Sequence, residues 1–118
     1  MADKIMTDGG LRSTLEIIRG IGSDRQEINA STIEAVADWQ GKMICFKTAC
    51  TVTVPSKLPE NFSCGWSQES AGVVTFVAGS GETLQSFGAA LKSSGQYAIG
   101  GIVGVGPATH RVYGQLVA

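Results

Sequence analysis

A single histidine, His110, is the first candidate for chemistry in this chain. Imidazole is the side chain that most readily exchanges a proton near neutral pH, but a lone histidine cannot share a metal site with a second one. Hydrolysis of the Ser-His-Asp type would also need an acidic side chain beside the ring. The segment that carries His110, "HRVYGQLVA", contains no Asp or Glu. We therefore expect a histidine at a strand end, at the surface or in an interface, and not a catalytic base.

Acidic side chains that act in pairs are a second possible chemistry, as in enzymes that hydrolyse glycosidic bonds. From residue 60 onward the acidic residues are Glu60, Glu69 and Glu82, and no two of them are close in sequence. A small hydrolase acting on cell-wall polysaccharide would need the fold to bring two of them together. Nothing in their spacing favours that arrangement, so a hydrolase is the weakest of the functions that we consider.

Three cysteines, Cys45, Cys50 and Cys64, offer thiol chemistry or metal binding. Their number is odd, and no two have the CxxC spacing of redox and zinc sites. Two of them fall in phase with apolar residues of β-like runs: Cys50 with Val52 and Val54, and Cys64 with Phe62 and Trp66. Free cysteines in such positions usually act as small buried apolar residues. We predict reduced, structural cysteines, because a reactive thiol or metal ligand would need a cluster of histidines or carboxylates nearby.

Two glycine-rich segments resemble phosphate-binding loops only superficially. In "GGIVGVGPATH", Gly104 and Gly106 supply a G-x-G pair, but Thr109 occupies the third glycine position and Pro107 follows at once. The segment "GSGETL" lacks the Lys-Ser/Thr pair of a phosphate loop. Both segments are better interpreted as turns and closely packed β-backbone. The sequence therefore assigns no catalytic, cofactor-binding or metal-binding residue, and it implies no cofactor.

The size and charge of the chain limit its partners. The chain has 118 residues, enough for one domain with its own core, and a formal net charge of −1. That charge provides no broad attraction to nucleic acid or to an anionic membrane. Neither an apolar run of ~20 residues nor a secretory signal in "MADKIMTDGG" is found. We expect a protein made in the cytoplasm that binds neither nucleic acid nor a membrane.

The charged residues are distributed unevenly. Residues 1–38 contain seven acidic and four basic side chains, whereas residues 70–118 contain only Glu82, Lys92 and Arg111. About a quarter of the residues in an ordinary domain are charged. A surface this poor in charge is typical of contact with another protein. We therefore predict that part of the 70–118 surface forms an interface.

Apolar and polar residues alternate with a period of two from residue 42 onward, which is typical of half-buried strands. In one of these runs, Val74, Phe76 and Ala78 are expected to share a face. Turns rich in Gly, Pro and Ser separate the runs. The pattern predicts a mainly β fold, an antiparallel β-sandwich or barrel of the jelly-roll kind, with at most one short helix. The alternating runs are 43–46, 50–54, 62–68, 73–78 and 110–118.

Three segments allow a helix. Residues 82–92, "ETLQSFGAALK", could form one short helix that Gly88 would weaken. In residues 31–42, "STIEAVADWQGK", Ser31 and Glu34 have the spacing of a capping box, and a strand from Thr32 is the alternative. Residues 11–22 fit a helix or a strand. We expect residues 1–30 to form an N-terminal arm and attachment segment, and residues 31–118 to form the β-rich domain.

Residues 38–118 resemble a module of virion proteins from tailed bacteriophages, found at tail-fibre and head-decoration positions. The resemblance lies in the order of "DWQGKMI", "TVTVP", "GVVTFVAGSGETL", "LKSSGQYAIGGIVGVG" and "HRVYGQL". The chain departs from the family pattern at Tyr113 and Gln115, where the family often has Trp or Val and Asp. The first 37 residues match nothing that we can name.

The resemblance implies a non-enzymatic homotrimer in the virion, produced in the cytoplasm of a host bacterium. The short segment ahead of the module favours a capsid decoration, or cement, protein that binds the major capsid protein of the assembled head and stabilises it. The alternative is a tail-fibre or tail-tip receptor-binding module. In that case the loops 79–82 and 93–96 would contact host glycans.

Overall fold

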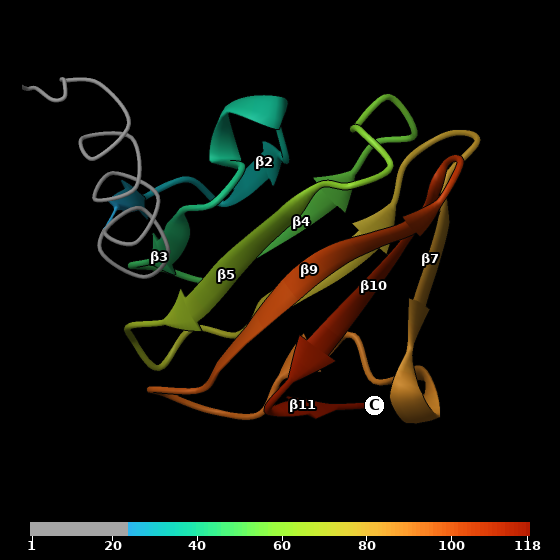
Figure 1. Ribbon diagram of the computed structural model, residues 1–118. Helices are drawn as coiled ribbons and strands as arrows, with labels where there is room; N and C mark the ends of the chain where they lie inside the picture. The colour runs from blue at the N-terminus through green and yellow to red at the C-terminus, as the bar shows by residue number, and fades with distance from the viewer. Residues whose placement is uncertain (1–23) are drawn as a thin grey trace, which may run out of the picture.

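The computed structural model describes residues 24–118, which form two β-sheets packed face to face (Figure 1). The predicted mainly β fold is confirmed. The first six strands alternate between the sheets, so that β1, β3 and β5 lie in the first sheet and β2, β4 and β6 in the second. Their bounds are β1 (Arg25–Ile28), β2 (Thr32–Glu34), β3 (Met43–Phe46), β4 (Cys50–Val54), β5 (Ser63–Gln68) and β6 (Val74–Ala78).

These six strands form three stacked coils of a solenoid-like body. Each coil contributes one strand to each sheet, and strands of successive coils pair in parallel: β1 with β3, β3 with β5, β2 with β4, and β4 with β6. The expected antiparallel jelly-roll arrangement is therefore wrong for this part of the chain. Both kinds of pairing alternate side chains between the two faces, so a period of two cannot distinguish them.

The remaining strands add to the last coil, mostly in antiparallel pairs. β9 (Ile99–Gly106) pairs antiparallel with β5 and β10, and β8 (Lys92–Ser93) pairs antiparallel with β6 and β11. β7 (Thr83–Ser86) lies parallel to β10 (Thr109–Gly114) at the edge of the first sheet, and β11 is Leu116–Val117. The sheet orders are β1-β3-β5-β9-β10-β7, called the six-stranded sheet below, and β11-β8-β6-β4-β2.

The core lies between the sheets and confirms most of the predicted alternation. In β4, Cys50, Val52 and Val54 point inward, with Thr51 and Thr53 half-buried between them. Val74 and Phe76 are buried as predicted, but Ala78 is exposed because it lies at the last position of β6, where the sheet ends. The large side chains that are wholly buried are Trp39, Trp66, Phe46, Phe62 and Phe76.

Two of the three segments that allowed a helix contain strands and short 3-10 turns. Residues 31–42 form β2 and the turn Ala37–Trp39, so the strand alternative is confirmed. The possible short helix over 82–92 does not form, since β7 and the turn Phe87–Ala89 occupy this segment. The backbone explains the outcome: Ala35 N–H donates to the Thr53 carbonyl and Thr83 N–H to the Ala108 carbonyl, both in sheet-like contacts.

The sheet begins earlier than the expected domain boundary. β1 starts at Arg25 and pairs with β3, so the last residues of the segment 1–30 that we assigned to an arm belong to the β body. The question of helix or strand at residues 11–22 lies outside the described residues. Within residues 24–118, no helix has the length and apolar character needed to cross a bilayer.

Candidate functional site

His110 is wholly buried, contrary to the expectation of a surface or interface position. Its Nδ1 atom lies 2.9 Å from Oε2 of Glu82, and its Nε2 atom lies 3.3 Å from the carbonyl oxygen of Pro59. The acidic partner comes from the turn before β7, 28 residues earlier, because β7 pairs with β10. Glu82 lies outside the segment "HRVYGQLVA", so the residues next to His110 in sequence do not predict this partner.

The buried pair links three segments and is not open to a substrate. The carbonyl of Pro59 can only accept, so this contact is a hydrogen bond in the tautomer whose proton is on Nε2. In a catalytic triad this nitrogen would face a hydroxyl or thiol, whereas here it faces backbone. Neither the His110 nor the Glu82 side chain has any exposed surface, and Oε1 of Glu82 has no hydrogen-bond partner. The arrangement connects the loop before β5, the turn before β7 and strand β10.

The three carboxylates considered for glycoside hydrolysis do not form an open pair. Glu60 precedes β5 and Glu69 follows it, so these two lie at opposite ends of that strand. The carboxylate of Glu69 accepts a hydrogen bond of 2.6 Å from the Ser67 hydroxyl. Glu82 is buried against His110. None of the three possible pairs therefore has both carboxylates exposed at the same end of the sheet.

The three cysteines are free and buried, as predicted for structural thiols. Burial raises the pKa of the Cys64 thiol to about 12, against a smaller lowering by the backbone of Ile102. Burial also raises the pKa of Cys50. A thiol with a raised pKa is a poor nucleophile because the thiolate is the reactive form. Over the described part of the chain, no group of three or more His, Cys, Asp and Glu side chains could hold a metal ion.

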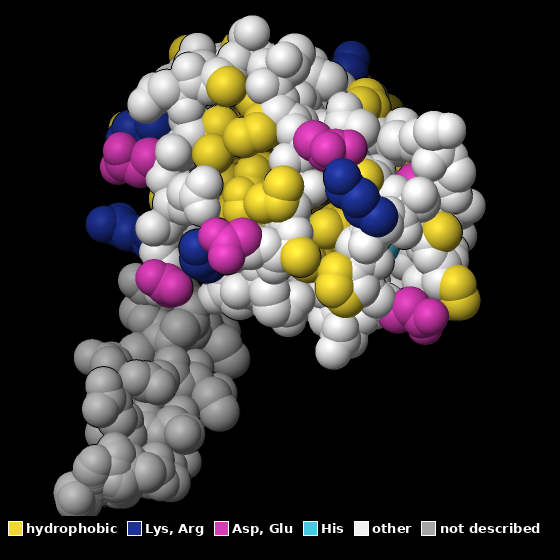
Figure 2. Space-filling view, turned by 90° about the horizontal axis from the view of Figure 1, so that it is seen from above, with side chains coloured by type: hydrophobic (Ala, Val, Ile, Leu, Met, Phe, Trp, Pro, Cys, Tyr) yellow, Lys and Arg dark blue, Asp and Glu magenta, His cyan; other side chains and the backbone are white. Residues whose placement is uncertain are grey.

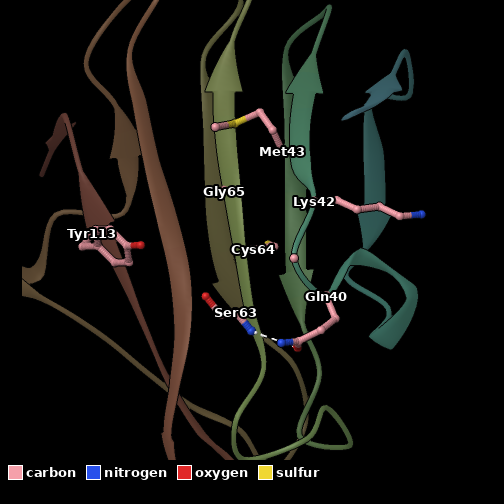
Figure 3. Close-up of a pocket in the computed structure, with 8 residues that line it drawn as sticks. Gln40, Lys42, Met43, Ser63, Cys64, Gly65 and Tyr113 are labelled. Carbon is pink, nitrogen blue, oxygen red and sulfur yellow. Dashed lines mark hydrogen bonds between the residues drawn. The ribbon is translucent and has the colours of Figure 1, made fainter. Parts of the chain in front are cut away.

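A hollow of about 260 Å³ lies on the outer face of the six-stranded sheet (Figure 3). Gly65 of β5 forms its floor, with Met43 of β3 on one side and Tyr113 of β10 on the other. At one end, Oε1 of Gln40 accepts a hydrogen bond of 3.1 Å from the Ser63 backbone. We call this site, lined by Gln40, Gly41, Lys42, Met43, Ser63, Cys64, Gly65 and Tyr113, the glycine-floored hollow.

Two glycines shape the hollow because they let larger side chains lie flat on the sheet. A Cβ atom on Gly65 would lie 2.8 Å from Cε of Met43, so the thioether covers the position where a side chain would otherwise stand. A Cβ atom on Gly101 of β9 would lie 2.4 Å from the hydroxyl oxygen of Tyr113. The tyrosine ring therefore rests on the backbone of β9, which agrees with the predicted close packing of this glycine-rich strand.

Large hydrophobic side chains are exposed mainly after residue 70. Eight of the nine exposed large hydrophobic residues in the described chain belong to this part: Val73, Val77, Phe87, Tyr97, Ile99, Val105, Tyr113 and Val117. Phe87 is 99% exposed. Because Glu82 is buried, Lys92 and Arg111 are the only two charged side chains of 70–118 at the surface.

Figure 2 shows one face of the molecule, on which hydrophobic side chains lie together near the centre and charged side chains lie on both sides of them. The exposed fractions of the residues, and not this view, show that the charge-poor segment after residue 70 carries most of the exposed large hydrophobic side chains. A surface of this kind is typical of contact between proteins.

Comparison of the chain with family models, curated proteins and solved structures finds no match. The resemblance to bacteriophage virion modules therefore stays a prediction from the sequence motifs.

Proposed function

We propose that the protein is a non-enzymatic structural protein of a bacteriophage virion, which binds the assembled head as a homotrimer and stabilises it. The observation that carries this proposal is the apolar, charge-poor surface of residues 70–118. Burying one large aliphatic or aromatic side chain stabilises a contact by roughly 1.5–3 kcal/mol. The eight exposed side chains after residue 70 lie on both sheets, and those that face a sister copy would contribute to association.

The chemistry of the buried groups supports a structural role. His110, Glu82 and Cys64 are the groups that an enzyme would use for proton transfer or nucleophilic attack, and all three side chains lie inside the body. Their contacts join loops and strands to one another. The surface hollow offers an aromatic ring, a thioether and amide groups, a set suited to binding and not to bond cleavage.

Stabilisation of a capsid by this protein follows from mass action. A ligand that binds only the assembled shell favours it by RT ln(1 + [L]/Kd) at each site, and a lattice has many equivalent sites. A trimer lets one small chain contact several subunits of the major capsid protein. We assign attachment to the segment ahead of β1, and the β body projects the apolar surface toward sister copies.

Electron microscopy of purified virions tests the location. The expected result is three-fold density of this protein on the outer surface of the head, which disappears in particles that lack the chain. Heads without the protein should also lose DNA at a lower temperature. If the chain is found only on the tail, or is missing from the virion, the proposed function is wrong.

Tyr97 favours a second candidate function, receptor binding at the tail tip. This residue is 73% exposed and has a positive φ of 73°, a backbone conformation that non-glycine residues rarely adopt. Two hydrogen bonds hold its loop: Tyr97 N–H to the Gln68 carbonyl at 2.7 Å, and the Gln96 amide to the Glu69 carbonyl at 3.2 Å. A fixed, exposed tyrosine offers a glycan both a ring face and a hydroxyl group. Binding of the purified protein to host cells, lost in Tyr97→Ala, would favour this function.

A further inference from the structure

The outer face of the six-stranded sheet carries a protruding side chain and a hollow of matching character. Phe87 protrudes from the turn that follows β7, at one edge of this sheet. Its neighbours in the turn and on the sheet face are Gln85 and Arg111, which share a shallow depression with it. The glycine-floored hollow lies farther across the same face, over β5.

The backbone holds Phe87 in place although its ring contacts almost nothing. Gly88 and Ala89 both have positive φ, of 68° and 57°, which reverses the chain directly after the phenylalanine. The Ser86 hydroxyl donates to the Ala90 carbonyl and closes the turn. Arg111 Nε donates to Oε1 of Gln85 at 3.0 Å, which fixes the side chains beside it. An exposed aromatic ring on a fixed turn is the usual form of an anchor residue in protein interfaces.

The size and chemistry of the hollow fit one aromatic side chain. Its volume of about 260 Å³ exceeds the roughly 150 Å³ of an apolar cavity that accepts benzene. Pockets for small-molecule ligands are larger, roughly 300–1,000 Å³. Met43 offers a thioether and Tyr113 a ring, and both interact favourably with an aromatic edge or face. Lys42 does not block entry, since its amine lies 3.3 Å from the Asp38 carboxylate and points away from Tyr113 (Figure 3).

A single chain cannot fill its own hollow with Phe87. The order of the strands is β5-β9-β10-β7, so three strand spacings separate the hollow from the edge that carries Phe87. At ~4.8 Å per spacing this is about 14 Å, beyond the reach of a phenylalanine side chain. Phe87 also does not line the hollow. A Phe87 ring in this hollow would therefore belong to another molecule.

We propose that Phe87 of one copy inserts into the glycine-floored hollow of the next copy, between Met43 and Tyr113. The protrusion and the hollow are different parts of one surface, so the contact joins unlike patches, and successive contacts form a closed ring of three when the rotation between copies is 120°. Three such contacts make the homotrimer. This inference rests on the proposed function, which already requires a trimer, and it names the residues that form the contact.

Photo-crosslinking tests the contact directly in the full-length protein. Phe87 is replaced by p-benzoylphenylalanine, whose excited ketone inserts into nearby C–H bonds and prefers those beside a thioether sulfur. The expected product is a covalent dimer in which position 87 of one chain is joined to Met43, Gly65 or Tyr113 of another, as mapped by peptide mass spectrometry. The control places the same photo-reactive residue at Val36, which is exposed but lies outside this face and should not label the hollow.

A substitution provides the second measurement. Phe87→Ser removes no core contact from the single chain, so the variant should fold normally. Its trimer should be weaker, with dissociation beginning at a protein concentration at least tenfold higher than for the wild type. Val77→Ser, on the other sheet, is the matched control and should leave the affinity within twofold. A wild-type trimer whose crosslinks map elsewhere, or whose affinity is unchanged by Phe87→Ser, overturns this contact alone. A wild-type protein that is monomeric at all concentrations overturns the trimer as well.

Discussion

Residues 24–69 and residues 70–118 contribute strands to the same two sheets, yet their surfaces differ. The first region has six acidic and four basic residues and one exposed large hydrophobic side chain, Val36. The second has two charged side chains at the surface and eight exposed large hydrophobic ones. The second region thus carries most of the exposed apolar side chains, Phe87 among them, whereas the hollow proposed to receive Phe87 is lined mainly by residues of the first region.

The charged groups of the first region are also organised by its fold. Ion pairs join Lys47 to Glu27 at 3.8 Å and Lys57 to Glu34 at 3.6 Å, in each case between neighbouring coils. Parallel stacking brings residues about 20 positions apart to the same height, so charges in one coil meet opposite charges in the next. In the second region, β9 of the six-stranded sheet carries glycines and apolar residues outward instead.

The largest expected effect concerns the core that the two regions share. Trp66 of β5 is wholly buried and packs against Phe76, with ring centroids 5.4 Å apart. Trp66→Ala should lower the free energy of unfolding by ~3–5 kcal/mol through lost contacts and the cavity left behind. Urea denaturation measures this loss. Phe87→Ala, at the exposed turn, should change the free energy of unfolding of the single chain by less than about 0.5 kcal/mol. A loss as large as that of Trp66→Ala would contradict the assignment of the Phe87 ring to an intermolecular contact.

A second prediction uses Cys64, which lies between the regions beside Ile102 of β9. Burial raises the pKa of its thiol to about 12, from 9.0. The neutral thiol therefore favours the folded state fully below pH 9, and this contribution is lost as the pH rises from 9 through about 12. At pH 8, alkylation of Cys64 by iodoacetamide should be roughly a thousandfold slower in the folded chain than in urea. Similar alkylation rates in the folded and the urea-unfolded chain, measured by mass spectrometry, would show that the pairing of β5 with β9 opens around Cys64 in the folded state.

Gly104 tests how closely the second region packs on the first. A Cβ atom at this position of β9 would lie 2.0 Å from the carbonyl oxygen of Glu60, and the Gly104 N–H donates to the Phe62 carbonyl at 2.7 Å. Gly104→Ala should therefore cost ~1–3 kcal/mol in the free energy of unfolding by displacing this loop. Gly106→Ala is the matched control, since nothing lies within 4 Å of its Cβ position. It should cost nothing and, by restricting the unfolded chain, could stabilise by up to ~1 kcal/mol. Equal losses of stability in Gly104→Ala and Gly106→Ala would contradict the close packing of Gly104 against the loop at Glu60.

The smallest effect is expected for the surface charges of the first region. Lys57 and Glu34 are largely exposed, so Lys57→Ala should change the free energy of unfolding by less than about 1 kcal/mol and leave the oligomeric mass unchanged. A large loss of stability, or dissociation, would indicate that the charged coils and not the apolar region hold the copies together. Thermal unfolding and light scattering measure the two quantities.

Local alternation predicted β3, β4, β5, β6 and β10 but not β1, β7, β8 or β9, because it reveals only strands in which one face is apolar and the other polar. Cys50, Val52 and Val54 were assigned to the core on this ground alone, correctly. The same alternation cannot reveal whether a strand has parallel neighbours, so the three stacked coils were missed. Pairing between segments far apart in sequence also decides which polar groups meet, which is why the Glu82 partner of His110 was missed.

The candidate contact surface was predictable only in part. The scarcity of charge after residue 70 predicted an interface, because the number of charged residues in a segment does not depend on how its strands are arranged. The hollow depends on the register that places Met43, Gly65, Gly101 and Tyr113 in one row across four strands. No local pattern contains that register. A helix over 82–92, which the sequence allows but Gly88 disfavours, would place Phe87 on an apolar stripe, and the exposure of its ring follows from the turn at Gly88 instead.

The mass of the purified protein in solution, measured by analytical ultracentrifugation across a range of concentrations, tests the central claim most directly. The account predicts a species with the mass of three chains of 12.3 kDa, which dissociates when Phe87 is replaced by serine. A single chain of 12.3 kDa at every concentration, with its apolar residues after 70 accessible to solvent, would contradict it.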